Sequence, residues 1–266
     1  MIDDNNKSLG YIHNEGLTIL DEIHKICSEN NISYFLDSGT ALGAIRHNGF
    51  IPWDDDIDIG MLRDDYERFV QIAKTKLNTD FYLHSYETDP NFPKFYIKIR
   101  KNGTIMHENG DECYNHQGLW VDIFPFDNVS NIHCIALFEI KVGRILRRLY
   151  FNRIKETKCL SPKSRLLHYL ICWIPKSWLR HLFESFCLLH NASKTRHLTC
   201  FAYKMARNMD LLFSRTDFDF FPLHKFEDRT YTIMNGYNNY LKIMYGNYME
   251  LPPEKERIGH IADTSL

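Results

Sequence analysis

The residues best suited to chemistry lie between Tyr34 and Met61, a stretch that holds five carboxylates. Asp56 and Asp58 are separated by one apolar residue, and alternate side chains of an extended strand point to the same face. Two such carboxylates repel each other unless a cation lies between them. Carboxylate oxygens suit Mg²⁺, which completes its shell with water and phosphate oxygens. The spacing therefore predicts a Mg²⁺ site, with Mn²⁺ as the alternative ion, and phosphoryl chemistry.

An isolated Asp-x-Asp pair is more often a solvated acidic turn, so the preceding residues decide between the two interpretations. Residues 32–36 read as a strand, 37–40 as a turn and 41–46 as the start of a helix. Backbone N–H groups at such a turn and helix N-terminus bind anions. In this interpretation Gly39 lets the backbone approach a phosphate, and Thr40 donates from its hydroxyl.

A third acid belongs to the predicted metal site although it lies far along the chain. Residues 119–124 read as a strand in which Asp122 is flanked by Val121 and Ile123. An acid in that position is partly buried and needs a partner, and the metal is the candidate. We therefore expect Asp122 to share the ion with Asp56 and Asp58.

Two cations are placed to neutralise a phosphate. Lys98 and Arg100 alternate along a predicted strand, 95–101, and so share one face. Asn102-Gly103 is a favoured two-residue hairpin turn, which predicts a partner strand at 104–107. A solvated strand face is the alternative interpretation of this pair.

These motifs, taken together, resemble the signature of the LicD family, bacterial phosphocholine transferases of the nucleotidyltransferase superfamily that are related to fukutin and fukutin-related protein. The matching segments are Gly39-Thr40-Ala41-Leu42-Gly43-Ala44-Ile45-Arg46-His47, Gly49 to Gly60, Lys98-Ile99-Arg100 with Thr104, Val121 to Asp127, and Tyr245-Gly246-Asn247-Tyr248-Met249 with Leu251-Pro252-Pro253. Residues 130–215 are weakly covered. The resemblance implies an α+β fold: a nucleotidyltransferase-like mixed sheet with flanking helices and a helical insertion.

The resemblance also implies roles for the residues. Its Trp-Asp-x-Asp-x-Asp pattern falls on Trp53, Asp54, Asp56 and Asp58, which leaves Asp55 as the least constrained acid. Asp54 or Asp58 would accept the proton of an acceptor hydroxyl. Further substrate contacts are expected from the cation at the end of helix 41–46, its neighbour and the two strand cations: Arg46, His47, Lys98 and Arg100.

Phosphocholine would require a different kind of contact, because its quaternary ammonium cannot donate a hydrogen bond. Aromatic faces bind such cations, and Trp53, Trp120 and Tyr96 are the candidates, with Tyr245 and Tyr248 closing over them. Phosphoribitol or phosphoglycerol transfer would use the same metal site without these rings.

Composition is that of an ordinary globular protein, with 44% hydrophobic and 25% charged residues. The N-terminus lacks the basic start and apolar run of a signal peptide, and we expect a cytoplasmic protein. The net charge of −2 hides an asymmetry: residues 141–180 hold eleven Lys or Arg against Glu156, a net charge of +10. This basic region predicts a peripheral contact with an anionic membrane through Arg144, Arg147 and Arg148, although a solvated face explains it equally well.

We expect three parts along the chain: a catalytic core at 1–130, a helical basic region at 131–215 and an aromatic-rich segment at 216–266 that packs back on the core. The helices expected outside the motifs are 8–29, 63–77, 133–152, 164–173, 176–190, 195–208 and 237–244, and the remaining strands are 56–61, 81–86 and 231–234.

The resemblance to the LicD family implies a Mg²⁺-dependent transferase that takes a phospho-alcohol from a CDP-linked donor, CDP-choline above all, to a hydroxyl of a cell-surface glycan, such as a lipid-linked precursor. Two alternatives remain: a nucleotidyltransferase that transfers NMP, and a non-catalytic nucleotide- or glycan-binding relative. The concentration of unpaired acids argues against a protein that only binds its ligand. The sequence contains no nucleic-acid-binding motif.

Overall fold

The computed structural model describes residues 2–107, 114–155, 161–203, 211–257 and 259, with the backbone alone for residues 2–8. The chain forms two compact units. The first contains Met1–Pro125 and Thr216–Leu266, so the C-terminal segment folds with the N-terminal half. The second contains Phe126–Arg215.

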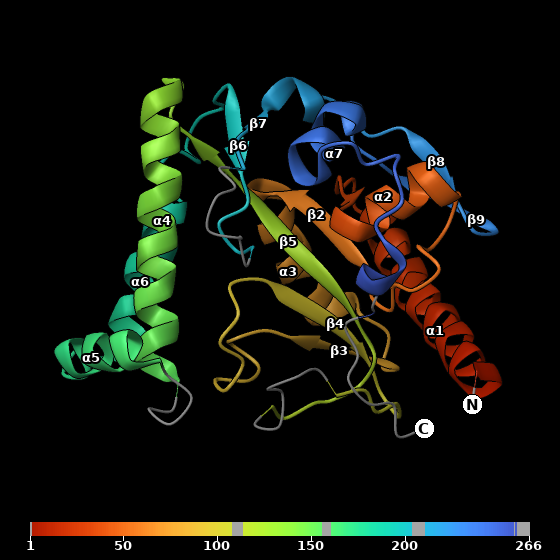
Figure 1. Cartoon of the computed structure of the whole chain (residues 1–266), viewed down its shortest axis with the longest axis horizontal. Helices are drawn as coiled ribbons and strands as arrows, with labels where there is room; N and C mark the ends of the chain where they lie inside the picture. The colour runs from red at the N-terminus through yellow and green to blue at the C-terminus, as the bar shows by residue number, and fades with distance from the viewer. Residues whose placement is uncertain (1, 108–113, 156–160, 204–210, 258, 260–266) are drawn as a thin grey trace. The chain divides into compact units, whose positions relative to one another are not determined.

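The main sheet confirms the expected α+β class. Its central path runs β1, β2, β5, β4, β3, and two short strands, β6 and β7, extend it from the far end of β5 (Figure 1). The backbone N–H of Asp122 on β5 donates to the carbonyl of Ile57, just ahead of β2. The strands are β1 (Phe35–Leu36), β2 (Asp58–Leu62), β3 (Phe81–His84), β4 (Ile97–Lys101), β5 (Trp120–Val129), β6 (His197–Thr199) and β7 (Phe213–Ser214).

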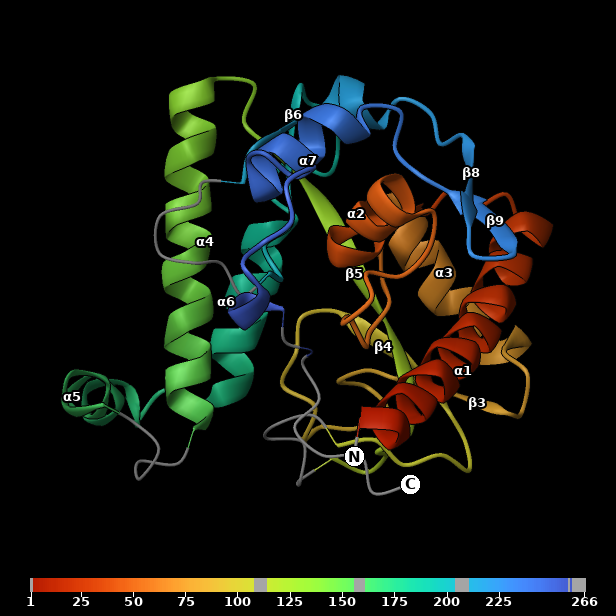
Figure 2. The same cartoon turned by 45° about the vertical axis from the view of Figure 1, so that its right-hand side comes forward.

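Helices of the first unit cover this sheet with apolar side chains at helical spacing. α1 (Ile2–Glu29) buries Leu17, Leu20 and Ile23, as its sequence pattern predicts. α3 (Arg63–Lys76) begins with two acids at the positive end of its dipole. α2 (Ser38–His47) and α7 (Tyr237–Tyr245) lie side by side in both views (Figures 1 and 2).

The segment after residue 215 supplies part of the core of the first unit. It contains a hairpin of β8 (Leu223–Phe226) and β9 (Arg229–Thr232), and the short 3-10 helices Arg215–Phe218 and Glu254–Glu256. Thr232 Oγ1 donates to the Tyr34 carbonyl at 2.6 Å, and the Phe218 ring lies 5.2 Å from that of Phe35. The first contact joins β9 of the hairpin to the residue before β1, and the second packs the 3-10 helix against β1.

The second unit is built on a pair of helices. α4 (His133–Ile154) and α6 (Lys176–Cys187) run side by side (Figures 1 and 2), and α5 (Pro162–Ile171) packs against α4. Gly143 on α4 lets two rings pack closely, because a Cβ there would lie 2.6 Å from the ring of Phe201, which follows β6, and 3.2 Å from the ring of Phe186 on α6. No helix within the described residues is long and apolar enough to cross a membrane.

Three local predictions are wrong. The expected turn at 37–40 is the first turn of α2, because Asp37 caps the helix by accepting the Ser38 N–H at 2.8 Å. Residues 104–107 form no strand; β4 pairs instead with β3 and β5. The helix expected at 195–208 is replaced at His197–Thr199 by β6, which pairs with β5 and so satisfies the outer end of that long strand; residues 204–208 lie outside the described residues.

Candidate active site

The centre of the site is the acidic loop, Trp53 to Ile57, which leads into β2. One carboxylate oxygen from each of Asp54, Asp55 and Asp56 lies within 4.8 Å of the others. Asp55 is buried, with 7% of its surface exposed. The loop is held from α1, where His13 Nε2 donates to the Asp54 carbonyl at 2.7 Å. The sequence pattern singled out Asp55 as least constrained, yet the structure places it inside the cluster.

Asp58, the first residue of β2, is fixed on both sides of its backbone. Its N–H donates to Thr40 Oγ1 at 2.8 Å, and its carbonyl accepts the N–H of Asp37 at 2.9 Å. Both partners belong to the start of α2. The hydroxyl that the sequence assigned to phosphate binding is thus buried and positions the acidic strand.

The electrostatics show how closely the carboxylates face one another. Burial raises the pKa of Asp58 well above its usual value, and then Asp56, Asp122, Asp37 and Asp54 raise it further, in that order. Burial and the charge of Asp55 raise the pKa of Asp54 to about 6. Concentrated negative charge of this kind is stabilised by a bound cation.

The donor set fits the expected metal. Asp54, Asp55 and Asp56 offer only hard carboxylate oxygens, at a spacing that one ion can bridge. The predicted ligands were Asp56, Asp58 and Asp122, so Asp56 is common to both sets.

The charge of Asp122 raises the pKa of Asp58, but Asp122 also has a cation of its own. Lys98 Nζ lies 2.9 Å from Asp122 Oδ1, and the Lys98 side chain is completely buried. The two residues are directly opposite on β4 and β5. Lys98 Nζ also lies 4.1 Å from the Trp120 ring centroid. The predicted phosphate-binding lysine is therefore an internal partner of the third acid.

Arg100 shares the predicted face with Lys98 but points into a buried polar network. Its Nε donates to His84 Nδ1 at 2.8 Å, and its Nη1 donates to the Gly118 carbonyl at 2.8 Å. The side chain is completely buried. The structure does not bring Arg100 to the acidic loop, which its sequence position could not reveal.

The remaining predicted residues lie around the loop. Gly39 is so close that a Cβ there would lie 2.7 Å from Asp54 Oδ2. Arg46 Nη1 donates to the Tyr248 carbonyl at 2.9 Å and so holds the C-terminal segment. His47 meets the Trp53 ring edge-on at 6.5 Å.

The family model of the LicD/FKTN/FKRP nucleotidyltransferase domain matches residues 31–143. A protein of Haemophilus influenzae named lipopolysaccharide cholinephosphotransferase LicD is 29% identical over 251 residues, which is 92% of each chain. The chain is therefore similar to the LicD family over residues 31–143, and to one LicD protein along most of its length. An uncharacterized protein of Rickettsia prowazekii is 46% identical over 163 residues, 57% of this chain and 60% of that protein. One of Rickettsia typhi is 48% identical over 121 residues, 46% of this chain and 31% of that protein.

The LicD-family match includes α2, the acidic loop, β2 and Asp122, but the site also depends on residues beyond it. The hydroxyl of Tyr240, on α7, donates to Asp37 Oδ1. Tyr245, at the end of the same helix, lies in the field of the cluster: burial raises the pKa of its hydroxyl, and Asp58 and then Asp37 contribute next. Asp37 was missed from sequence, although its position directly before the helix that carries Gly39 is a capping signal.

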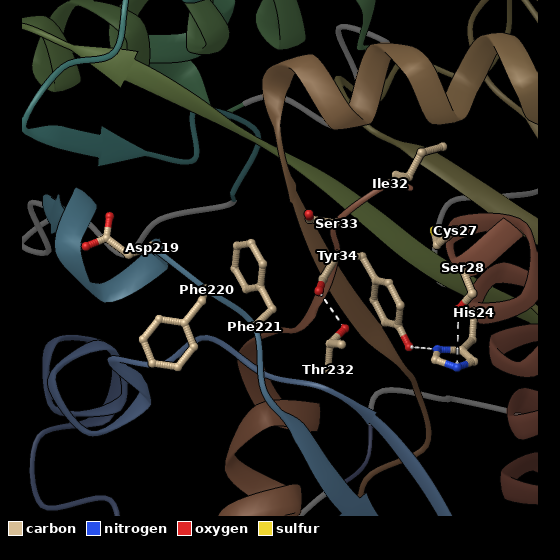
Figure 3. A pocket seen from close by; sticks show the side chains of 10 residues that line it. All are labelled: His24, Cys27, Ser28, Ile32, Ser33, Tyr34, Asp219, Phe220, Phe221 and Thr232. Carbon is tan, nitrogen blue, oxygen red and sulfur yellow. Dashed lines mark hydrogen bonds between the residues drawn. The ribbon is translucent and has the colours of Figure 1, made fainter. Parts of the chain in front are cut away.

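A cavity of about 390 Å³ lies elsewhere in the first unit and contains none of the predicted site residues (Figure 3). The Tyr34 hydroxyl and His24 Nδ1 are hydrogen-bonded at 2.7 Å on one side of it. Phe220 and Asp219 lie on the other side (Figure 3). The residues that line this cavity include none of the acidic loop.

Proposed function

We propose that this chain is a phosphotransferase that moves phosphocholine from CDP-choline to a hydroxyl of lipopolysaccharide, with Mg²⁺ bound at the acidic loop. The observation that carries the proposal is the cluster of Asp54, Asp55 and Asp56, set in a LicD-family domain. The likeness of the chain to a lipopolysaccharide cholinephosphotransferase, along 92% of both chains, supports the choice of donor and acceptor.

The reaction is a displacement at phosphorus. The acceptor oxygen forms a bond to the choline-bearing phosphorus, the bond from that phosphorus to the bridging diphosphate oxygen breaks, and CMP leaves. A bound Mg²⁺ would neutralise the negative charge of the diphosphate. Asp54, in the cluster, or Asp58, beside it, takes the proton of the acceptor hydroxyl, because within the described residues neither has a lysine partner such as Lys98 is to Asp122.

The surrounding residues orient this machinery. Thr40 and Asp37 fix the backbone of Asp58 through hydrogen bonds. Trp53 offers a ring beside the loop, and the guanidinium carbon of Arg257 lies 5.3 Å from its centroid. We propose that the choline ammonium binds at the Trp53 ring. The contact with Arg257 shows that the face of this ring accepts a cation.

Incubation of the full chain with Mg²⁺, purified lipopolysaccharide and one CDP-alcohol at a time tests the proposal. We expect CMP release and choline incorporation with CDP-choline, and little with CDP-ribitol or CDP-glycerol. Chelation of the metal should stop the reaction. Release of CMP from CDP-ribitol alone would reject the choline assignment, and incorporation of a nucleotide into the acceptor would favour an NMP transferase instead.

A further inference from the structure

One helix of the second unit turns its apolar side outward. Along α5 and the turn after it, four large side chains recur at the spacing i, i+3, i+4 and i+7, which places them on one helix face. Their exposed fractions are high: Leu166 64%, Tyr169 61%, Leu170 63% and Trp173 78%. Trp178, near the start of α6, is 55% exposed. We call these five side chains the α5–α6 apolar surface.

The orientation of α5 is fixed by its opposite face. His168 Nδ1 donates to the Asn152 carbonyl on α4 at 2.9 Å, and Asn152 Nδ2 donates to the Ser164 carbonyl at 2.9 Å. Ile171 is buried on the same side. The turn that follows is tied down as well, because Arg153 Nε donates to the Ile174 carbonyl at 3.0 Å. The exposed rings therefore belong to the folded arrangement of the unit.

Basic residues predominate around this surface, although one of them, Arg180, is buried and paired with Glu184. From Thr157 to Phe183 the sequence contains five Lys or Arg and no Asp or Glu. Lys163, Arg165 and Lys176 are exposed next to the apolar side chains. Of the three cations predicted from the sequence to bind the membrane, Arg148 is exposed, whereas Arg144 and Arg147 are half-buried. The Arg147 guanidinium lies 4.9 Å from the Phe151 ring.

We propose that the α5–α6 apolar surface binds an anionic membrane, with its rings and leucines in the interfacial layer and its cations at the lipid headgroups. Amphipathic helices with aromatic and aliphatic side chains beside Lys and Arg bind membranes in this way, and Trp and Tyr favour the interface. A second copy of the chain is a poorer occupant, because it would bring the same cations against each other. This inference uses no residue of the acidic loop, so it can fail while the proposed function holds.

Co-sedimentation of the full chain with vesicles tests the membrane surface. One set contains phosphatidylcholine alone, and the other contains about 30% phosphatidylglycerol. We expect binding to the anionic set only, reversed by raising the salt to about 0.5 M. Absence of binding to the anionic vesicles, or equal binding to both sets at any salt concentration, would overturn the proposal.

Two variants separate the contributions, and a third is the matched control. Leu170→Gln with Trp173→Gln removes apolar contact without changing charge and should abolish binding. Changing Lys163, Arg165 and Lys176 to Gln should weaken binding to anionic vesicles about 100-fold, since each basic residue contributes about 1 kcal/mol. Phe220→Gln with Leu223→Gln changes equally exposed side chains, 61% and 65%, of the first unit.

The control should bind like the unchanged protein, and equal loss in the control would reject this location. Circular dichroism melts verify that each variant is folded, and sedimentation velocity tests the other occupant. A dimer that the Leu170 and Trp173 changes convert to a monomer would show that a second copy covers the surface, and would overturn the membrane assignment.

Discussion

Gly39 and Asp54 are in such close contact that a single methyl group between them is a sensitive probe of the site. In Gly39→Ala the new Cβ would lie 2.7 Å from Asp54 Oδ2. The end of an aspartate can rotate away, so the fold should tolerate the change while the carboxylate leaves its position. We expect turnover to fall about 10- to 100-fold, the effect of a displacement near 1 Å, with the melting temperature nearly unchanged.

The control for this substitution lies on α1. Gly10→Ala meets nothing within 4 Å, and alanine favours a helix by about 1 kcal/mol over glycine. It should retain full turnover and slightly raise stability. Full turnover in Gly39→Ala would show that the position of Asp54 does not matter to the reaction.

Asp55 should be as important as its two neighbours. Asp55→Asn and Asp56→Asn each remove a charge from the cluster and little packing, and each should lower turnover by about two to three decades. Asp58→Asn should do the same. Mn²⁺ binding, followed by electron paramagnetic resonance, distinguishes the ligands independently of activity.

Loss of Mn²⁺ affinity in Asp55→Asn but not in Asp58→Asn would assign the ion to residues 54–56. The reverse result would support the set predicted from sequence, Asp56, Asp58 and Asp122. Unchanged affinity and turnover in all three variants would refute a metal site in this loop.

At the scale of elements, β3 and β4 are linked by a buried histidine whose protonation should lower stability. His84 Nδ1 accepts from Arg100, so Nε2 carries the proton and donates to Asp89 Oδ2 at 3.1 Å. Burial, and then the charge of Arg100, lower the pKa of His84 from 6.5 to about 4. Because the folded pKa is below the unfolded one, the unfolded chain binds the proton first as pH falls.

The resulting stability is present above pH 6.5 and is lost as pH falls toward 4. The loss at pH 5 should be about 1–2 kcal/mol in the free energy of unfolding. Asp54 acts in the opposite direction, because its raised pKa makes the folded chain bind a proton first between pH 6 and 4. Urea titrations at several pH values give the free energy of unfolding of the unchanged protein and of His84→Gln. The difference between the two proteins cancels the Asp54 contribution, which both share. An identical pH slope in both proteins would contradict the prediction.

The elements also show what the sequence could and could not predict. Long periodic patterns predicted α3 and α4 to within two residues, since each helix needs one apolar face. The strand pairing of β6 could not be predicted, because it depends on an unpaired edge of β5 that is 70 residues away in sequence. Likewise no strand was predicted at β8, where Phe226 is buried at the end of a hairpin.

The candidate site was likewise only partly predictable from the sequence. Local alternation and family resemblance singled out Asp54, Asp56 and Asp58, but they left Asp55 as the least constrained acid, whereas the structure places Asp55 in the cluster. The internal pairing of Lys98 with Asp122 was not predicted, because opposite residues on neighbouring strands can be identified only once the register is known. Arg100 shows the same limit, since its direction depends on the buried His84.

At the scale of the whole chain, the C-terminal segment is part of the core of the first unit. Tyr231 is 1% exposed, and its hydroxyl donates to Asp21 Oδ1 at 2.7 Å. Tyr231→Ala should therefore lower the free energy of unfolding by about 3–5 kcal/mol. Phe220→Ala, at an exposed position of the same segment, should change it by less than about 0.5 kcal/mol. Chemical denaturation measures both, and equal effects would show that the segment adds no core.

The hydrogen bond between Tyr240 and Asp37 also bears on how the protein is made. Asp37 caps the helix that fixes Asp58, and its carboxylate receives the Tyr240 hydroxyl from a residue synthesised 203 positions later. Domains of this size fold as units while the ribosome adds residues one by one. A nascent chain can thus form its first helices early, but the acidic loop obtains its final support only after residue 240 has emerged. Interrupted translation would then release fragments that contain every acidic residue of the loop and lack the support that organises them.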